Sequence, residues 1–221
     1  PLKVNGDSSS PIGYNIHFPT GDEIDNIVVN VYGGDGDSKE ISYLPGDLGN
    51  LDHYLLQRGT VIITLNLPDL LKLTESQRNM PEEVHTEIHQ AINKFYQTLK
   101  KEPQKLHPAL ASLNIQNKKI FLKGSSFGGR TAIRHSELYP QTFTGYISHD
   151  GSLSAEMIEM SDRLKRPMYK PWLDPVQEID KIQEPLLLMQ NRDDNNVNAK
   201  VTLGFYKLLE ERNKSHLARV W

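Results

Sequence analysis

The sequence predicts an α/β protein in which a mostly parallel central sheet is flanked by helices. Two observations lead to this prediction: short apolar runs rich in β-branched residues alternate with helical patterns, and clusters of glycine, proline and polar residues separate them. A chain of 221 residues is long enough for one sizeable core. We therefore expect one domain over residues 1–221.

The first part of the chain supplies three of the predicted strands. The clearest covers 27–32, where β-branched residues suit a pleated sheet and Gly33-Gly34 ends the run. A weaker run at 14–18 precedes it, and another apolar run covers 60–66. A helix is predicted from Pro81, because proline suits the first turn and the apolar residues that follow share one face. That face comprises Val84, Ile88, Ile92, Phe95 and Leu99.

The second part continues the alternation. A strand at 119–123 leads into a glycine turn, and a helix is predicted from Phe127 to about Tyr139. Two more strands are predicted at 142–148 and 185–190. A helix follows the second of these, and its apolar face comprises Val201, Phe205, Leu208 and Leu209. A last strand is predicted to begin near Leu217.

Composition excludes several classes of function. The net charge of −3 and a pI of about 6.3 offer no surplus of positive charge for a nucleic acid. No apolar run approaches the ~20 residues that a membrane span needs, so we expect a soluble chain, whose compartment stays open. The sequence has no cysteine, and its acidic loops lack the later glutamate of a calcium loop. We expect neither a metal nor a cofactor.

The stretch Gly124-Ser-Ser126-Phe-Gly128-Gly has the pattern Gly-x-Ser-x-Gly, between a predicted strand and a predicted helix. A serine in such a turn sits at a strained apex, where its hydroxyl is exposed for nucleophilic attack. Small flanking residues are needed because the turn is too tight for a Cβ atom. The simpler alternative is a glycine turn that only packs a helix against the sheet. Ser125 does not fit the pattern, so the candidate nucleophile is Ser126.

Further motifs follow in an order that resembles a known family. They are Tyr32-Gly33-Gly34, the Ser126 motif, and Ile182-x-x-Pro185-Leu-Leu-Leu followed by Asp194-x-x-Val197. In this order and spacing the chain resembles the catalytic domain of the prolyl oligopeptidase family of serine peptidases, from about residue 12 onward. The resemblance implies the α/β-hydrolase fold.

The resemblance also implies roles for individual residues. Ser126 would be the nucleophile and Asp194 the triad acid, since Val197 stands three places after it. Tyr32 would donate its hydroxyl to the oxyanion beside the backbone amide of Phe127, and the loop at Gly33 would shape this site. The chain departs from the family in having Asn66-Leu-Pro where an Arg-Gly pair is usual, and Gln190-Asn where a His-Gly pair is usual.

The catalytic histidine is expected beyond Trp221, because it should follow the last strand at the edge of the sheet that carries Ser126. His216 is expected at the opposite edge. His149 is better placed, with Asp150 beside it as an alternative acid, but a strand-end histidine bonded to backbone is the simpler interpretation. His85 and His89 have zinc-ligand spacing without a third ligand, so they are interpreted as a solvated helix face.

The expected function is therefore that of a serine hydrolase, an esterase or a peptidase, acting on a small ester or peptide substrate. The segment 152–184 is interpreted as a lid-like insertion, with Met and aromatic side chains that suit a substrate pocket. Helices packed on the domain are the alternative for this segment. The chain itself is expected to be a fragment that lacks its C-terminal end. The competing function is a binding or effector domain that keeps the fold without a complete triad.

Overall fold

The computed structural model describes residues 3–5, 13–21, 23–31, 50–66, 82–151, 178–194 and 199–221. These residues form an eight-stranded sheet with the order β1-β2-β4-β3-β5-β6-β7-β8. The first two pairings, β1 with β2 and β2 with β4, are antiparallel and the other neighbours are parallel. The strands are β1 (Lys3–Asn5), β2 (Gly13–His17), β3 (Asn26–Val31), β4 (Thr60–Asn66), β5 (Lys119–Ser125), β6 (Gly145–His149), β7 (Leu186–Met189) and β8 (Ala218–Val220). The predicted α/β class with a mostly parallel sheet is confirmed.

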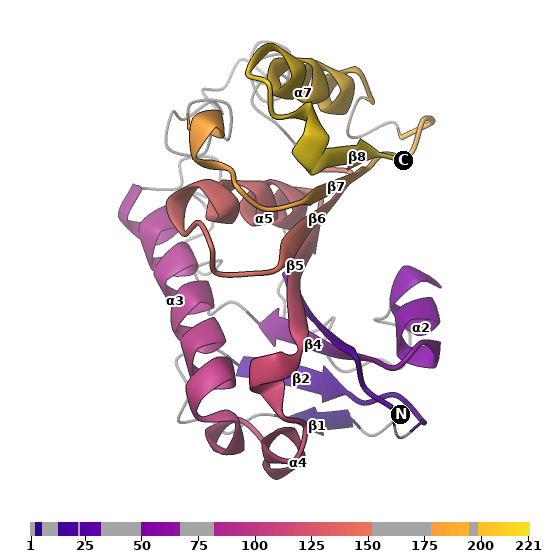
Figure 1. The fold of residues 1–221 in the computed structure, drawn as a ribbon, viewed down its shortest axis with the longest axis vertical. Coiled ribbons are helices and arrows are strands. Elements are labelled where there is room, and N and C mark those ends of the chain that lie inside the picture. The colour runs from indigo at the N-terminus through magenta and orange to yellow at the C-terminus, as the bar shows by residue number, and fades with distance from the viewer. Residues whose placement is uncertain are drawn as a thin grey trace, which may run out of the picture.

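Helices cover both faces of this sheet. Figure 1 shows α3 and α5 on one side and α2 on the other. The helices are α2 (Asn50–Gln57), α3 (Glu82–Lys101), α4 (Pro108–Ala111), α5 (Phe127–Leu138) and α7 (Ala199–Glu211), with 3-10 turns at Pro103–Lys105, Ile115–Asn117, Ile179–Lys181 and Ser215–Leu217. None of the helices in the described ranges is long and apolar enough to cross a membrane.

Alternation along the strands divides the core between the two faces, because successive side chains in a strand point to opposite sides. Val29, Ile63 and Leu122 belong to the larger cluster, which also contains buried residues of α3, α5 and α7. Val28 and Ile62, one position earlier, pack with a second and smaller cluster that includes α2. The described residues of the predicted apolar faces of α3 and α7 therefore face the core, as expected.

A buried ion pair ties α2 to the strand that precedes the glycine turn. The Nζ atom of Lys123 in β5 lies 2.6 Å from the Oδ1 atom of Asp52 in α2, and both side chains are buried. Removing one partner would leave an uncompensated buried charge, which is far more costly than losing an exposed pair. This contact fixes where α2 sits on the sheet.

Most predicted elements are observed, with bounds that differ by a few residues. The strand at 60–66 is confirmed in full, while the strand predicted from 142 begins only at Gly145. The helix α2 and the strand β1 were not predicted. Of the predicted lid at 152–184, residues 152–177 lie outside the described residues, as does the side chain of Val84.

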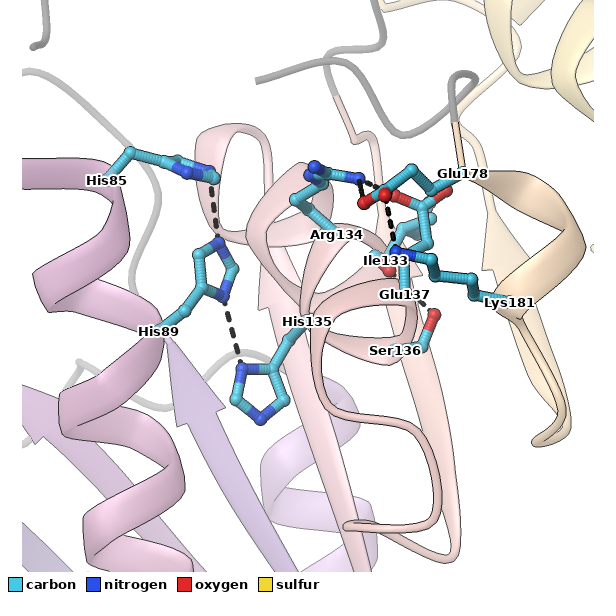
Figure 2. Close-up of polar contacts among 9 residues, drawn as sticks. All are labelled: His85, His89, Ile133, Arg134, His135, Ser136, Glu137, Glu178 and Lys181. Atoms are coloured by element: carbon cyan, nitrogen blue, oxygen red, sulfur yellow. Dashed lines mark hydrogen bonds and ion pairs between the residues drawn. The ribbon is translucent and has the colours of Figure 1, made fainter. Parts of the chain in front are cut away.

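The prediction that His85 and His89 form a solvated helix face is wrong. Both are buried, at 5% and 0% exposure, where α3 packs against α5. The Nε2 atoms of His85 and His89 are 3.0 Å apart, and the Nδ1 atom of His89 lies 3.1 Å from the Nδ1 atom of His135 in α5. Figure 2 shows the three rings as one chain between the helices. The polar face was misread because its partner is 46 residues away in sequence.

Three neutral imidazoles satisfy these contacts. Each contact pairs a donor nitrogen with an acceptor nitrogen, so two rings in contact cannot both be doubly protonated. Burial lowers the pKa of both His85 and His135 to about 3, and it lowers the pKa of His89 well below 6.5. Nearby Arg134 and Arg130 contribute to this lowering of the His85 pKa, after burial. Arg134 is itself paired with Glu137 and Glu178 (Figure 2).

We predict that the free energy of unfolding falls as the pH is lowered from 7 to 5. Below pH 6.5 the unfolded chain binds protons at these histidines and the folded chain does not, so protons favour unfolding. Each histidine should contribute up to roughly 1.4 kcal/mol per pH unit, a slope that is approached near pH 5, where the unfolded imidazole is almost fully protonated. Urea titrations at several pH values measure the slope. His85→Gln should make it shallower, whereas His53→Gln, at an exposed position, should not. Equal slopes for the two variants would contradict this account.

Candidate active site

Ser126 lies at a strained turn between β5 and α5. The strand ends at Ser125 and the helix begins at Phe127, which leaves Ser126 alone between them with φ 51° and ψ −119°. A positive φ is unfavourable for a residue with a Cβ atom and persists only where the surroundings enforce it. Here the Ser126 N–H donates to the carbonyl oxygen of His149 in β6, at 2.9 Å. The predicted strand-turn-helix arrangement around Ser126 is present.

Gly124 shows why this turn needs glycine. A Cβ atom at Gly124 would lie 2.0 Å from the carbonyl oxygen of Gly128 and 2.2 Å from its carbonyl carbon. Real Cβ atoms do not approach backbone atoms so closely, and the partner here is main chain that cannot rotate away. The first turn of α5 therefore folds directly back onto the end of β5.

A second close approach holds α5 against the end of β6. A Cβ atom at Gly129 would lie 2.8 Å from the Cα atom of Gly151, and one at Gly151 would lie 2.2 Å from the Oγ atom of Ser148. The start of α5 thus packs closely against the ends of β5 and β6. The guanidinium of Arg130 lies over the Phe127 ring, 4.5 Å from its centroid.

The N-terminus of α5 points its dipole toward Ser126. The amide of Phe127 belongs to the first helical turn, whose N–H groups have no acceptor within the helix. Such groups carry partial positive charge and stabilise an anion at the helix N-terminus. An oxyanion formed by attack of Ser126 on a carbonyl would develop near this end of the helix.

The other two residues of the expected oxyanion site, Tyr32 and Gly33, lie outside the described residues. The strand that leads to them, β3, ends at Val31, which pairs with Gly124 of β5. The chain therefore leaves β3 at the same edge of the sheet as the Ser126 turn.

Asp194 follows β7 at this same carboxyl edge. The Asp194 N–H donates to the carbonyl oxygen of Asn191 at 3.2 Å, and the Asp193 N–H donates to the Asn191 side-chain oxygen at 3.1 Å. Asp193 is exposed and Asp194 is half-buried. Because β5, β6 and β7 are parallel neighbours, Ser126 and Asp194 both follow strands that end at the carboxyl edge of the sheet. The end of β6 lies between the ends of these two strands.

The two histidines considered near the site lie at opposite edges. His149 is the last residue of β6, at the carboxyl edge, and its Nε2 atom lies 3.3 Å from the Oδ2 atom of Asp150. His216 lies in the turn that precedes β8, which is the opposite edge, as expected. No described group of three or more His, Asp or Glu side chains is arranged to hold a metal ion.

One polar contact at this edge could not be found from the sequence. The Asp150 carboxylate accepts a hydrogen bond from the Asn191 N–H at 2.6 Å, which joins the end of β6 to the loop that carries Asp194. From the sequence, Asp150 is only an alternative acid. Its signal in the sequence is an Asp-Gly pair directly after a strand, which is typical of a residue with positive φ, but nothing in the sequence identifies its partner.

We predict that Gly124→Ala severely destabilises the protein. The methyl group would overlap the Gly128 backbone, so the helix must move off the strand, at a cost of about 3 kcal/mol or more. The matched control is Gly204→Ala in α7, where a Cβ atom meets nothing within 4 Å. This change should stabilise by up to ~1 kcal/mol. Thermal unfolding measures both, and a Tm for Gly124→Ala equal to wild type would contradict the steric account.

Comparison with known proteins gives matches by structure alone. No family model matches the sequence, and no curated protein matches it. The acylaminoacyl peptidase of Pyrococcus horikoshii aligns with TM-score 0.67 and 19% identity, over 100% of this chain and 36% of that one. This chain therefore spans about a third of the length of that peptidase.

Smaller proteins align over most of their length. MGS-MChE2, an α/β hydrolase enzyme from the metagenome of lagoon sediments at Mar Chica, Morocco, has TM-score 0.63 and 15% identity, with 99% of this chain and 86% of that one covered. S-formylglutathione hydrolase (FrmB) from Staphylococcus aureus has TM-score 0.65 and 14% identity, with 100% of this chain and 89% of that one covered. At these identities the alignments establish the fold. The described sheet, its helices and the strained serine turn together show that this chain has the α/β-hydrolase fold.

Proposed function

We propose that this protein is a serine hydrolase that cleaves ester or peptide bonds through an acyl-enzyme. The observation that supports this most directly is the backbone of Ser126, held at positive φ between β5 and α5. In the proposed reaction the Ser126 hydroxyl oxygen attacks a carbonyl carbon and its proton passes to a base. The alcohol or amine leaves with that proton, and water then hydrolyses the ester formed on Ser126.

The oxyanion in this proposal is held by the Phe127 amide and the Tyr32 hydroxyl, with Gly33 shaping the loop. The support is positional: Phe127 opens α5, and Val31, just before Tyr32, pairs with Gly124 beside the serine turn. Preorganised donors of this kind account for a large share of the rate in acyl transfer.

Asp194 is the proposed acid, because it follows β7 at the edge that carries Ser126 and is less exposed than Asp193. The base that it would orient is proposed to be a histidine. All eight histidines of the sequence lie among the described residues. Of these, His149 stands at the carboxyl edge, where its ring contacts Asp150. The proposed substrate is a small ester or peptide, since both bond types are open to this chemistry.

We predict that a fluorophosphonate probe forms one covalent adduct, on Ser126. The probe mimics the tetrahedral species and needs an activated serine, so a serine that only shapes a turn would not react. Intact mass and peptide mapping of the full-length protein measure the adduct. Ser126→Ala should abolish labelling, and the neighbouring Ser125→Ala should retain it. An unlabelled wild type would contradict the proposal and favour a binding domain built on the same fold.

We predict that Asp194→Asn slows probe labelling at least about 10²-fold, because the amide cannot stabilise the charged histidine that forms during attack. Asp193→Asn is the matched control, since it changes the neighbouring carboxylate in the same loop and should leave the rate within about twofold. The two rates are compared at one probe concentration. If the Asp193 variant were the slower one, the assignment of the acid would be wrong.

A further inference from the structure

We infer that Asp150 is a positioning residue, which holds the loop 190–194 and with it Asp194 in register with the Ser126 turn. This inference rests on the proposed function, because it concerns the acid of the same reaction. It assigns Asp150 a role distinct from that of a triad acid: its carboxylate acts on the loop and not on the base.

The contacts of Asp150 bridge two strand ends. Its N–H donates to the carbonyl oxygen of Met189, the last residue of β7, at 2.8 Å. Its Oδ1 atom accepts from the Asn191 N–H at 2.6 Å, and its Oδ2 atom faces the His149 ring at 3.3 Å. Both carboxylate oxygens are therefore engaged. A hydrogen bond from a backbone N–H to a carboxylate is among the stronger ones in proteins.

Asn191 links Asp150 to the proposed acid, Asp194. Its carbonyl oxygen accepts from the Asp194 N–H at 3.2 Å and from the Gln190 side chain at 3.2 Å. Its side-chain oxygen accepts from the Asp193 N–H at 3.1 Å. The loop thus closes on Asn191, and the Asn191 N–H is held in turn by Asp150. Displacing Asn191 would displace the backbone of Asp194.

The residue before Asp150 contacts the proposed nucleophile. The carbonyl oxygen of His149, directly before Asp150, accepts from the Ser126 N–H at 2.9 Å. Two adjacent residues at the end of β6 therefore hold the serine turn on one side and the acid loop on the other. This places both proposed catalytic residues on one rigid support, which acyl transfer requires because small displacements of catalytic groups cost large factors in rate.

The backbone of Asp150 allows a sharp experiment. Its φ is 47°, which glycine and asparagine adopt more easily than other residues. Asp150→Gly removes the acceptor without backbone strain, and Asp150→Asn keeps an oxygen acceptor but removes the charge. Asn213→Gly is the matched control, since Asn213 has φ 55° and lies after α7, away from the carboxyl edge.

The experiment measures two quantities on the full-length protein: hydrogen exchange of the backbone amides in residues 189–194, and the rate of fluorophosphonate labelling at Ser126. In Asp150→Gly we expect exchange at Asn191 and Asp194 to rise roughly tenfold or more, and labelling to slow by a similar factor. Asp150→Asn should stay within a few-fold of wild type in both, and Asn213→Gly should match wild type.

Three results would overturn the inference. Unchanged exchange in Asp150→Gly would show that the carboxylate does not hold the loop. Faster exchange with unchanged labelling would show that the loop does not position the acid. If Asp150→Asn lost labelling while its hydrogen exchange stayed at the wild-type rate, the charge of Asp150 would act on the reaction directly and not through the loop. In all three the wild type is labelled, whereas a wild type that is not labelled contradicts the proposed function itself.

Discussion

The contact between Gly124 and the backbone of Gly128 is the constraint on which the site depends. Because no side chain intervenes, α5 can begin two residues after β5 ends, and the single residue between them is held at positive φ. A longer or looser connection would let Ser126 relax into an ordinary turn. The strain is balanced by bonds on both sides, where Ser126 donates to His149 and its own carbonyl oxygen accepts from the Arg130 N–H at 3.2 Å.

Parallel strands then gather the remaining groups. Each of β3, β5, β6 and β7 runs in the same direction, so the residues that follow them emerge at one edge. Polar groups at this edge form hydrogen bonds with one another: the Asp150 carboxylate accepts from the Asn191 N–H, and the Asn191 carbonyl oxygen accepts from the Asp194 N–H. His135, in the last turn of α5, belongs to the buried histidine chain, which joins this helix to α3. The helix that supports the serine is therefore held at both its start and its end.

The elements that could be predicted are those whose signal is local. Strand β4 has a β-branched apolar run, and the serine turn has glycines at fixed spacing, so both could be located without a structure. Helix α2 was not predicted, and its contacts are long-range: Asp52 pairs with Lys123, 71 residues away, and Leu56 packs with Val28 and Ile62. The burial of His85 and His89 likewise depends on His135. Local patterns locate the candidate nucleophile and its edge of the sheet, and long-range pairings determine how the surrounding elements pack.

The most direct test of Ser126 as a nucleophile is to trap the acyl-enzyme itself. The full-length protein would be mixed with an activated ester, quenched in acid within the first turnover, and digested with trypsin. The account predicts an acyl group on the peptide 124–130, assigned to Ser126 by fragmentation. An acyl group on Ser125, or none on this peptide while the ester is consumed, would contradict it.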